Sequence, residues 1–306
     1  MALYELAVLG CPSTDQLAFV TAAFEQAASQ FKLRVGDEIK LLVQPETFRP
    51  DQRTCAAAVF FGGAGGPDID VSQVIDVKSL PVLPVASTAS CVSSEIPESL
   101  RGLNCIFTEK SSPDRIFATL LECVGLLPRQ RRVFLSYKRD EATTAAVQLF
   151  SELSSRQFEV FLDTHGIGAG VDFQEALWHQ LCDVDVLVML ETPGYFDSRW
   201  TSAEYGRALS KGIGVLRVQW PDSTPSIHTA TASRVEIVPN ELLANASLAS
   251  SAIDRISEQL EAVRSLSHAT RQLSMITAVQ SAVEQVEGSV IGVGANRSID
   301  AFLAPR

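Results

Sequence analysis

The segment WTSAEYGRAL, residues 200–209, places an indole four residues before a carboxylate in a stretch with a helical pattern. Residues four apart are neighbours on a helix, so Trp200 and Glu204 are expected to share a face. A carboxylate stabilises a developing cation, and an indole attracts a cationic ring. By spacing alone, a solvated surface acid is the more common role of a helical glutamate. The elements around the helix therefore decide between the two interpretations.

The surrounding sequence predicts a compact parallel sheet. We expect buried strands at residues 132–137, 158–163, 184–190 and 213–218, and helices at 142–157, 173–182 and 201–211. Strands that alternate with helices are typical of a flavodoxin-like α/β unit. Ligands of such sheets bind at the carboxyl ends of the strands, where Lys138, Arg139, the glycine-containing loop 163–170 and the helix of Glu204 are expected to converge.

The first part of the chain, residues 1–127, predicts a second α/β domain of Rossmann or flavodoxin-like type. Its expected strands are residues 4–9, 38–43, 56–61, 82–86 and 105–108, and its expected longer helices are 14–31 and 113–126. The sequence VFFGGAGGPD, residues 59–68, puts four glycines after a strand, where a ligand can approach the backbone. We expect a sensor or scaffold role for this domain, through an activating ligand or a partner protein.

The chain beyond residue 222 predicts a polar loop followed by a long helix. Apolar residues recur at three-to-four spacing over residues 250–287, and Gly288 ends the pattern. This helix could pack onto its own chain or pair with another copy. A hairpin is expected to turn near Ala295 and Asn296. The predicted organisation is an α/β domain at 1–127, a second at 131–222, and a C-terminal association element at 250–306.

Composition and charge exclude several classes of function. The 306 residues carry a net charge of −11 with no basic segment, which disfavours nucleic acid and anionic membranes as partners. No apolar run is long enough to span a bilayer, and the first residues lack the basic region of a signal peptide, so a cytoplasmic location is expected. The six cysteines and four histidines show no metal-ligand spacing, so no metal site is expected.

Three motifs, in order, resemble those of Toll/interleukin-1 receptor (TIR) domains. They are VFLSYKRDE at 133–141, FEVFLDTHGIGAGVDFQEAL at 158–177, and FDSRWTSAEYGRAL at 196–209. The second resembles the strand and BB loop of the family, although Gln157 stands where the family usually has glycine. The third resembles its SxWxxxE helix. The order and spacing of all three make the match specific, and it covers less than a third of the chain.

The resemblance implies an enzyme, because bacterial, plant and axon-degeneration TIR domains cleave the bond between nicotinamide and ribose in NAD+. It implies Glu204 as the catalytic residue and a flavodoxin-like fold. The implied substrate-binding residues are Trp200, Phe173, Lys138, Arg139, Tyr137, Asp163 and Gly168. NAD+ would be the substrate, with no further cofactor. The product, ADP-ribose or a cyclic isomer, is left open.

The same resemblance implies activation by self-association of TIR domains, and a role in bacterial immunity against phage. A second class of function stays open at this point. Some TIR domains are adaptors that bind other TIR domains without chemistry, or modulate signalling as virulence factors. Glu204, Trp200 and Phe173 occur together here, which favours the enzyme.

Overall fold

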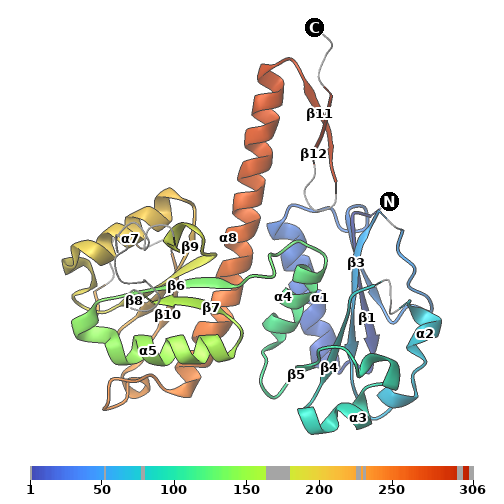
Figure 1. The fold of residues 1–306 in the computed structure, drawn as a ribbon, viewed down its shortest axis with the longest axis horizontal. Helices are drawn as coiled ribbons and strands as arrows, with labels where there is room; N and C mark the ends of the chain where they lie inside the picture. The colour runs from blue at the N-terminus through green and yellow to red at the C-terminus, as the bar shows by residue number, and fades with distance from the viewer. Residues whose placement is uncertain are drawn as a thin grey trace, which may run out of the picture. The chain divides into compact units, whose positions relative to one another are not determined.

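The computed structural model describes residues 2–51, 53–76, 80–162, 180–224, 229, 232–294 and 299–302 (Figure 1). The chain divides into two compact units. The N-terminal unit comprises Met1–Arg129 and Ala269–Arg306, and the second unit comprises Gln130–His268. Each unit contains a five-stranded parallel sheet, which confirms the predicted α/β class.

The N-terminal unit follows the sequence prediction closely. Its strands are β1 (Tyr4–Gly10), β2 (Ile39–Val43), β3 (Cys55–Phe61), β4 (Val82–Ala86) and β5 (Ile106–Phe107). Its helices are α1 (Thr14–Gln30), α2 (Val71–Val74), α3 (Val92–Glu95) and α4 (Pro113–Cys123), with single 3₁₀ turns at Gly66–Asp68, Ala89–Cys91 and Glu98–Leu100. The sheet order β2-β1-β3-β4-β5 is that of flavodoxin-like folds.

Strand alternation explains why both faces of this sheet are covered. Tyr4, Leu6 and Val8 of β1 pack with α1 and α4, whereas Ala7 and Leu9 point to the opposite face. The second face is covered by the short helices α2 and α3 (Figure 1). A strand buried on both sides reads as a continuous apolar run, which is why β1 and β3 were predictable.

Gly10 permits a close backbone approach, and its replacement by alanine is expected to destabilise the N-terminal unit. Gly10 has φ +82°, and an added Cβ would lie 2.2 Å from the carbonyl oxygen of Phe61. Gly36 has φ +88° with nothing within 4 Å of an added Cβ, so Gly36→Ala is the matched control. Both variants should lose about 1–2 kcal/mol for the left-handed backbone. Gly10→Ala should lose roughly 1–3 kcal/mol more for overpacking.

Hydrogen exchange in β1 and β3 measures this difference, because faster exchange of their amides reports opening of the sheet. Equal exchange in the two variants would contradict the importance of the contact between Gly10 and Phe61.

The second unit repeats the same strand order. It contains β6 (Arg132–Tyr137), α5 (Arg139–Ser155), β7 (Glu159–Leu162), β8 (Val186–Glu191), a 3₁₀ turn at Tyr195–Asp197, α7 (Arg199–Ser210), β9 (Gly214–Gln219) and β10 (Ser233–Glu236). The sheet order is β10-β9-β8-β6-β7. The four predicted strands are present, and β10 adds a fifth. The predicted helix 173–182 lies largely outside the described residues.

The second unit extends beyond residue 222, where the sequence placed its end. Helix α8 (Ser250–Gln285) contributes Ile253, Ile256 and Leu260 to the core cluster that also contains residues of β6, β8 and β9. A buried ionic network reinforces this packing. Arg264 of α8 is fully buried, and its Nε lies 3.2 Å from Oδ2 of Asp185, the residue before β8. The first half of α8 is therefore a core element of this unit.

The second half of α8 carries apolar side chains on the surface. Met275, Val279 and Val286 are 67%, 41% and 55% exposed.

Strands β11 (Ser289–Val293) and β12 (Ile299–Phe302) follow and pair antiparallel, in agreement with the predicted hairpin, whose turn lies outside the described residues. None of the described helices combines the length and apolar character needed to cross a bilayer.

Candidate functional site

Helix α7 holds Glu204 on its inner face. Ser198 caps the helix by accepting a hydrogen bond from the Trp200 amide, at 3.3 Å. The buried side chains Thr201, Glu204, Tyr205 and Ala208 follow at three-to-four spacing, so this face packs against the sheet. Glu204 is only 3% exposed. It is therefore not the solvated surface acid that spacing alone favoured.

Ser136 and Tyr195 form a hydrogen-bonded chain with Glu204. Ser136 Oγ lies 2.5 Å from Glu204 Oε2 and 2.6 Å from Tyr195 Oη. A hydroxyl has one proton, so when Ser136 donates to the carboxylate, Tyr195 must donate to Ser136. Burial, and then the charge of Glu204, raise the pKa of Tyr195 well above its ordinary value. Tyr195 therefore stays protonated, and two donors in series support the negative charge of Glu204.

The pleat of β6 explains why Ser136 faces α7. Phe134 belongs to the core cluster that includes Tyr205 and Ala208 of α7, and Ser136 lies two residues later on the same face. Tyr137 points to the other face, where it packs with residues of α5 and α8. The structure therefore separates Tyr137, a predicted substrate-binding residue, from Glu204 by the thickness of the sheet.

A buried ion pair lies on the same face of the sheet. Arg217 of β9 directs Nη2 and Nε to Glu191 Oε2, at 2.5 and 2.9 Å, and both residues are at most 2% exposed. The carbonyl oxygen of Thr229 accepts a further bond from Arg217 Nη1 at 3.0 Å. Met189 of β8 pairs with both Ser136 and Arg217 in register, so the ion pair and the Ser136 chain occupy neighbouring strands.

Lys138 is held by its own helix at the end of β6. Its Nζ lies 2.7 Å from Glu141 Oε1, and Glu141 Oε2 accepts a hydrogen bond from the Gly194 amide at 3.0 Å. The hydrogen bond from Lys138 lowers the pKa of Glu141. A Cβ on Gly194 would lie 2.2 Å from Lys138 Nζ, so the absence of a side chain at this position leaves space for the ion pair of Lys138 and Glu141. Lys138 thus joins the loops after β6 and β8.

Trp200 and Arg139 lie at the surface. Trp200 is 45% exposed, and the guanidinium of Arg199 stands 4.5 Å from the centre of its ring. The indole therefore makes a cation–π contact with a residue of its own helix. Arg139 is the exposed first residue of α5.

Three predicted site residues, Asp163, Gly168 and Phe173, lie outside the described residues, as does the loop 163–170. Of the predicted residues, Lys138 directly follows β6, and Arg139, Trp200 and Glu204 lie in helices that begin beyond the carboxyl ends of β6 and β8. Among the residues that the structure describes, no three His, Cys, Asp or Glu side chains gather in a group able to hold a metal ion.

Comparison with known proteins identifies this unit. The family model described as "TIR domain" matches residues 133–240, which include the strand with Ser136, the helix with Glu204 and the added strand β10. Residues 133–240 are a TIR domain. No curated protein matches the sequence.

Solved structures of TIR domains are similar to parts of the chain. The TIR domain of the Toll-related receptor TRR-2 from Hydra magnipapillata is 11% identical, with 36% of this chain and 86% of that chain covered and a TM-score of 0.33. The TIR domains of the activated Roq1 resistosome, which recognises the effector XopQ, are 17% identical, with 46% and 82% covered and a TM-score of 0.31. The assignment rests on the family match.

The TIR domain contains polar residues that sequence reasoning missed. Ser136 lies within the expected strand 132–137, and neither Ser136 nor Tyr195 is among the predicted site residues. The period-two pattern of RVFLSY would have placed Ser136 on the face opposite Leu135 and Tyr137, and hence toward a covering helix. No signal in the sequence pairs Glu191 with Arg217, since the contact depends on strand register.

Proposed function

We propose that this TIR domain is an NAD+ glycohydrolase, with Glu204 as the catalytic carboxylate and with a signalling role in immunity against phage. The observation that carries the proposal is the placement of Glu204 on α7, supported by donors from Ser136 and Tyr195. Burying a carboxylate costs free energy unless donors support its charge, and a glutamate on an exposed helix face would need no such chain of donors.

The proposed reaction needs one carboxylate. The bond between the ribose carbon and the pyridinium nitrogen breaks, and its electron pair leaves with neutral nicotinamide. The cationic sugar that remains is stabilised by the negative charge of Glu204. Water then adds to the sugar, and its proton passes to Glu204 and on to solvent, giving ADP-ribose. Capture by a hydroxyl of the same molecule would give a cyclic isomer instead.

Trp200 would bind the departing ring. Stacking of an indole on a cationic pyridinium contributes about 0.5–2 kcal/mol. The guanidinium of Arg199 contacts this indole in the free chain, so the pyridinium of NAD+ would have to displace it. Lys138 and Arg139 would lie near the phosphates. Asp163, Gly168 and Phe173 stay in the proposal as substrate-binding residues.

The burial of Glu204 supports activation by assembly. A side chain that is 3% exposed cannot contact a ribose, so the free chain corresponds to a resting state. Self-association is proposed to open the site. The apolar row Met275, Val279 and Val286 on α8 is the proposed contact with a second copy.

A single charge on this row should therefore weaken assembly and activity together. Val279→Glu is expected to reduce self-association at least about ten-fold, with a parallel loss of NAD+ turnover. Ser281→Glu adds the same charge two residues away, on the other side of the helix, and should leave both unchanged. Light scattering and nicotinamide release measure the two quantities. Deleting α8 is a poorer test, because it removes Ile253, Ile256 and Leu260 from the core.

The test of the proposed function is nicotinamide release from NAD+ by the purified full chain at increasing protein concentration. A rate per molecule that rises with concentration supports an enzyme activated by assembly. The same burial of Glu204 also suits an adaptor that binds other TIR domains without chemistry. A chain that assembles and leaves NAD+ intact would establish the adaptor instead.

A further inference from the structure

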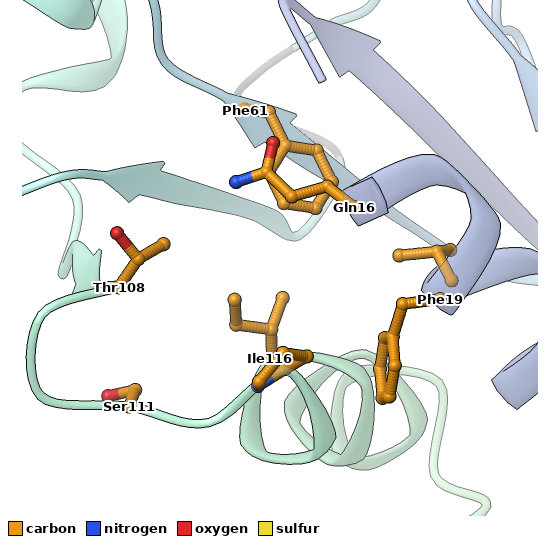
Figure 2. Close-up of a pocket in the computed structure, with 8 residues that line it drawn as sticks. Gln16, Phe19, Phe61, Thr108, Ser111 and Ile116 are labelled. Atoms are coloured by element: carbon orange, nitrogen blue, oxygen red, sulfur yellow. The ribbon is translucent and has the colours of Figure 1, made fainter. Parts of the chain in front are cut away.

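The N-terminal unit contains a pocket of about 140 Å³ at the carboxyl end of its sheet. Figure 2 shows Ile116 of α4 pointing into the space between α1 and the loop that precedes α4. Phe19 and Val20 of α1 and Phe61 of β3 complete the apolar wall. In open α/β sheets this end of the strands is where ligands bind.

The size of the pocket matches one ring. An apolar cavity of roughly 150 Å³ in another protein stays dry and takes up benzene. A single six-membered ring therefore fits this pocket, whereas a fused two-ring system is too large. Its apolar wall is shared by two helices and the sheet, so a bound ring would contact each layer of the unit.

The polar groups at the pocket select for a neutral molecule with a hydrogen-bonding group. Gln16, Thr108 and Ser111 line it, and Figure 2 shows Thr108 and Ser111 on the side away from Phe19. The carboxamide oxygen of Gln16 accepts from the Ser13 amide at 2.8 Å, so its NH₂ group is the end that can donate to a ligand.

Charge argues against an anion. Among the described residues that line the pocket, none is a lysine, arginine or histidine. The first turns of the two helices that begin beside it carry Asp15 and Asp114. Asp15 precedes the lining residue Gln16, and Asp114 follows the lining residue Pro113, so a carboxylate or phosphate would lie near two negative charges with no cation among the described lining residues.

We propose that this pocket binds a small uncharged molecule with one aromatic ring and one carbonyl or hydroxyl group. The ring lies between Phe19, Phe61 and Ile116, and the polar group meets Gln16, Thr108 or Ser111. The N-terminal unit is a candidate sensor, and this site indicates the chemical class of ligand that it would bind. The site is independent of NAD+ cleavage, because each described lining residue belongs to the N-terminal unit.

Binding of benzyl alcohol to the full chain, followed by ligand-observed NMR, tests the proposal. We expect saturable binding with a Kd of about 1 mM or tighter. Benzoate should bind at least ten-fold more weakly, because it is charged. Ser111→Phe should fill the pocket and weaken the binding of benzyl alcohol at least ten-fold. Ser90→Phe, which adds the same ring at an exposed position outside the pocket, should leave the Kd unchanged.

A second variant keeps the test decisive if Ser111→Phe does not fold. Ile116→Val removes one methyl group from the wall and should shift the preference toward 4-methylbenzyl alcohol. Three results would overturn the proposal: no saturable binding, equal affinity for benzoate, or equal weakening by the two phenylalanine substitutions. Because only binding is measured, a failure here is distinct from a failure of the proposed NAD+ cleavage.

Discussion

Glu204→Gln is expected to lower nicotinamide release by at least about 10²–10³-fold, the loss typical when one preorganised electrostatic group is removed from an active site. Glutamine keeps the shape of the side chain and an oxygen that accepts from Ser136, but it has no negative charge to stabilise the ribosyl cation. The decrease should therefore appear in kcat more than in KM, since the interaction is made with the transition state.

The same substitution should leave the second unit folded. A buried neutral amide is easier to desolvate than a buried carboxylate, and the hydrogen bond from Ser136 is retained. We expect a change in unfolding free energy within about 1 kcal/mol. All three tryptophans, Trp178, Trp200 and Trp220, belong to the second unit, so their fluorescence reports its unfolding.

Glu159→Gln is the matched control for loss of one carboxylate. Glu159 begins β7, its side chain is 51% exposed, and it pairs with Arg132 at the surface. Its replacement should leave NAD+ turnover unchanged. Similar rates for Glu204→Gln and wild type would show that the site assignment is wrong, even if the protein cleaves NAD+.

Arg217→Met is expected to destabilise the second unit by about 3–5 kcal/mol, the loss typical when one partner of a buried ion pair is removed. Glu191 would keep its charge at 2% exposure without the guanidinium that now contacts it. The carbonyl of Thr229 would lose the bond from Arg217 and keep the one from the Ala232 amide. Urea denaturation followed by tryptophan fluorescence measures the loss.

A double variant separates the charge from the packing. Glu191→Leu combined with Arg217→Met replaces the pair with apolar side chains, so no uncompensated charge remains. We expect the double variant to be more stable than Arg217→Met alone. If the losses of unfolding free energy caused by Glu191→Leu and by Arg217→Met simply add in the double variant, the two residues are not coupled. The ion pair would then not be what stabilises this part of the sheet.

The apolar strands were predictable because each is buried on both faces. Strands β1, β3, β6 and β8 give continuous apolar runs, and helices α1 and α4 begin at the side-chain caps Ser13 and Ser112. Strand β10 was missed. Its sequence SRVE buries only Val235, and it follows a polar loop that carries no strand signal.

The candidate site was predictable in position but not in detail. The spacing of Trp200 and Glu204 put both on α7, yet one is exposed and the other buried. The difference arises from where the inner face of the helix is centred, which depends on contacts with β6 that are 68 residues away in sequence. Partners at such separation, including Arg217 for Glu191, follow from sheet register and have no local signature.

The participation of α8 in the second unit has a genetic consequence. A stop codon at position 250 would leave every motif of the TIR domain intact, including Glu204. The product would nevertheless lack Ile253, Ile256 and Leu260 from its core, and Asp185 would lose the guanidinium of Arg264. In a screen of alleles, nonsense mutations near codon 250 should therefore behave as loss of the TIR domain itself. A gene fragment meant to encode that domain must reach at least codon 268.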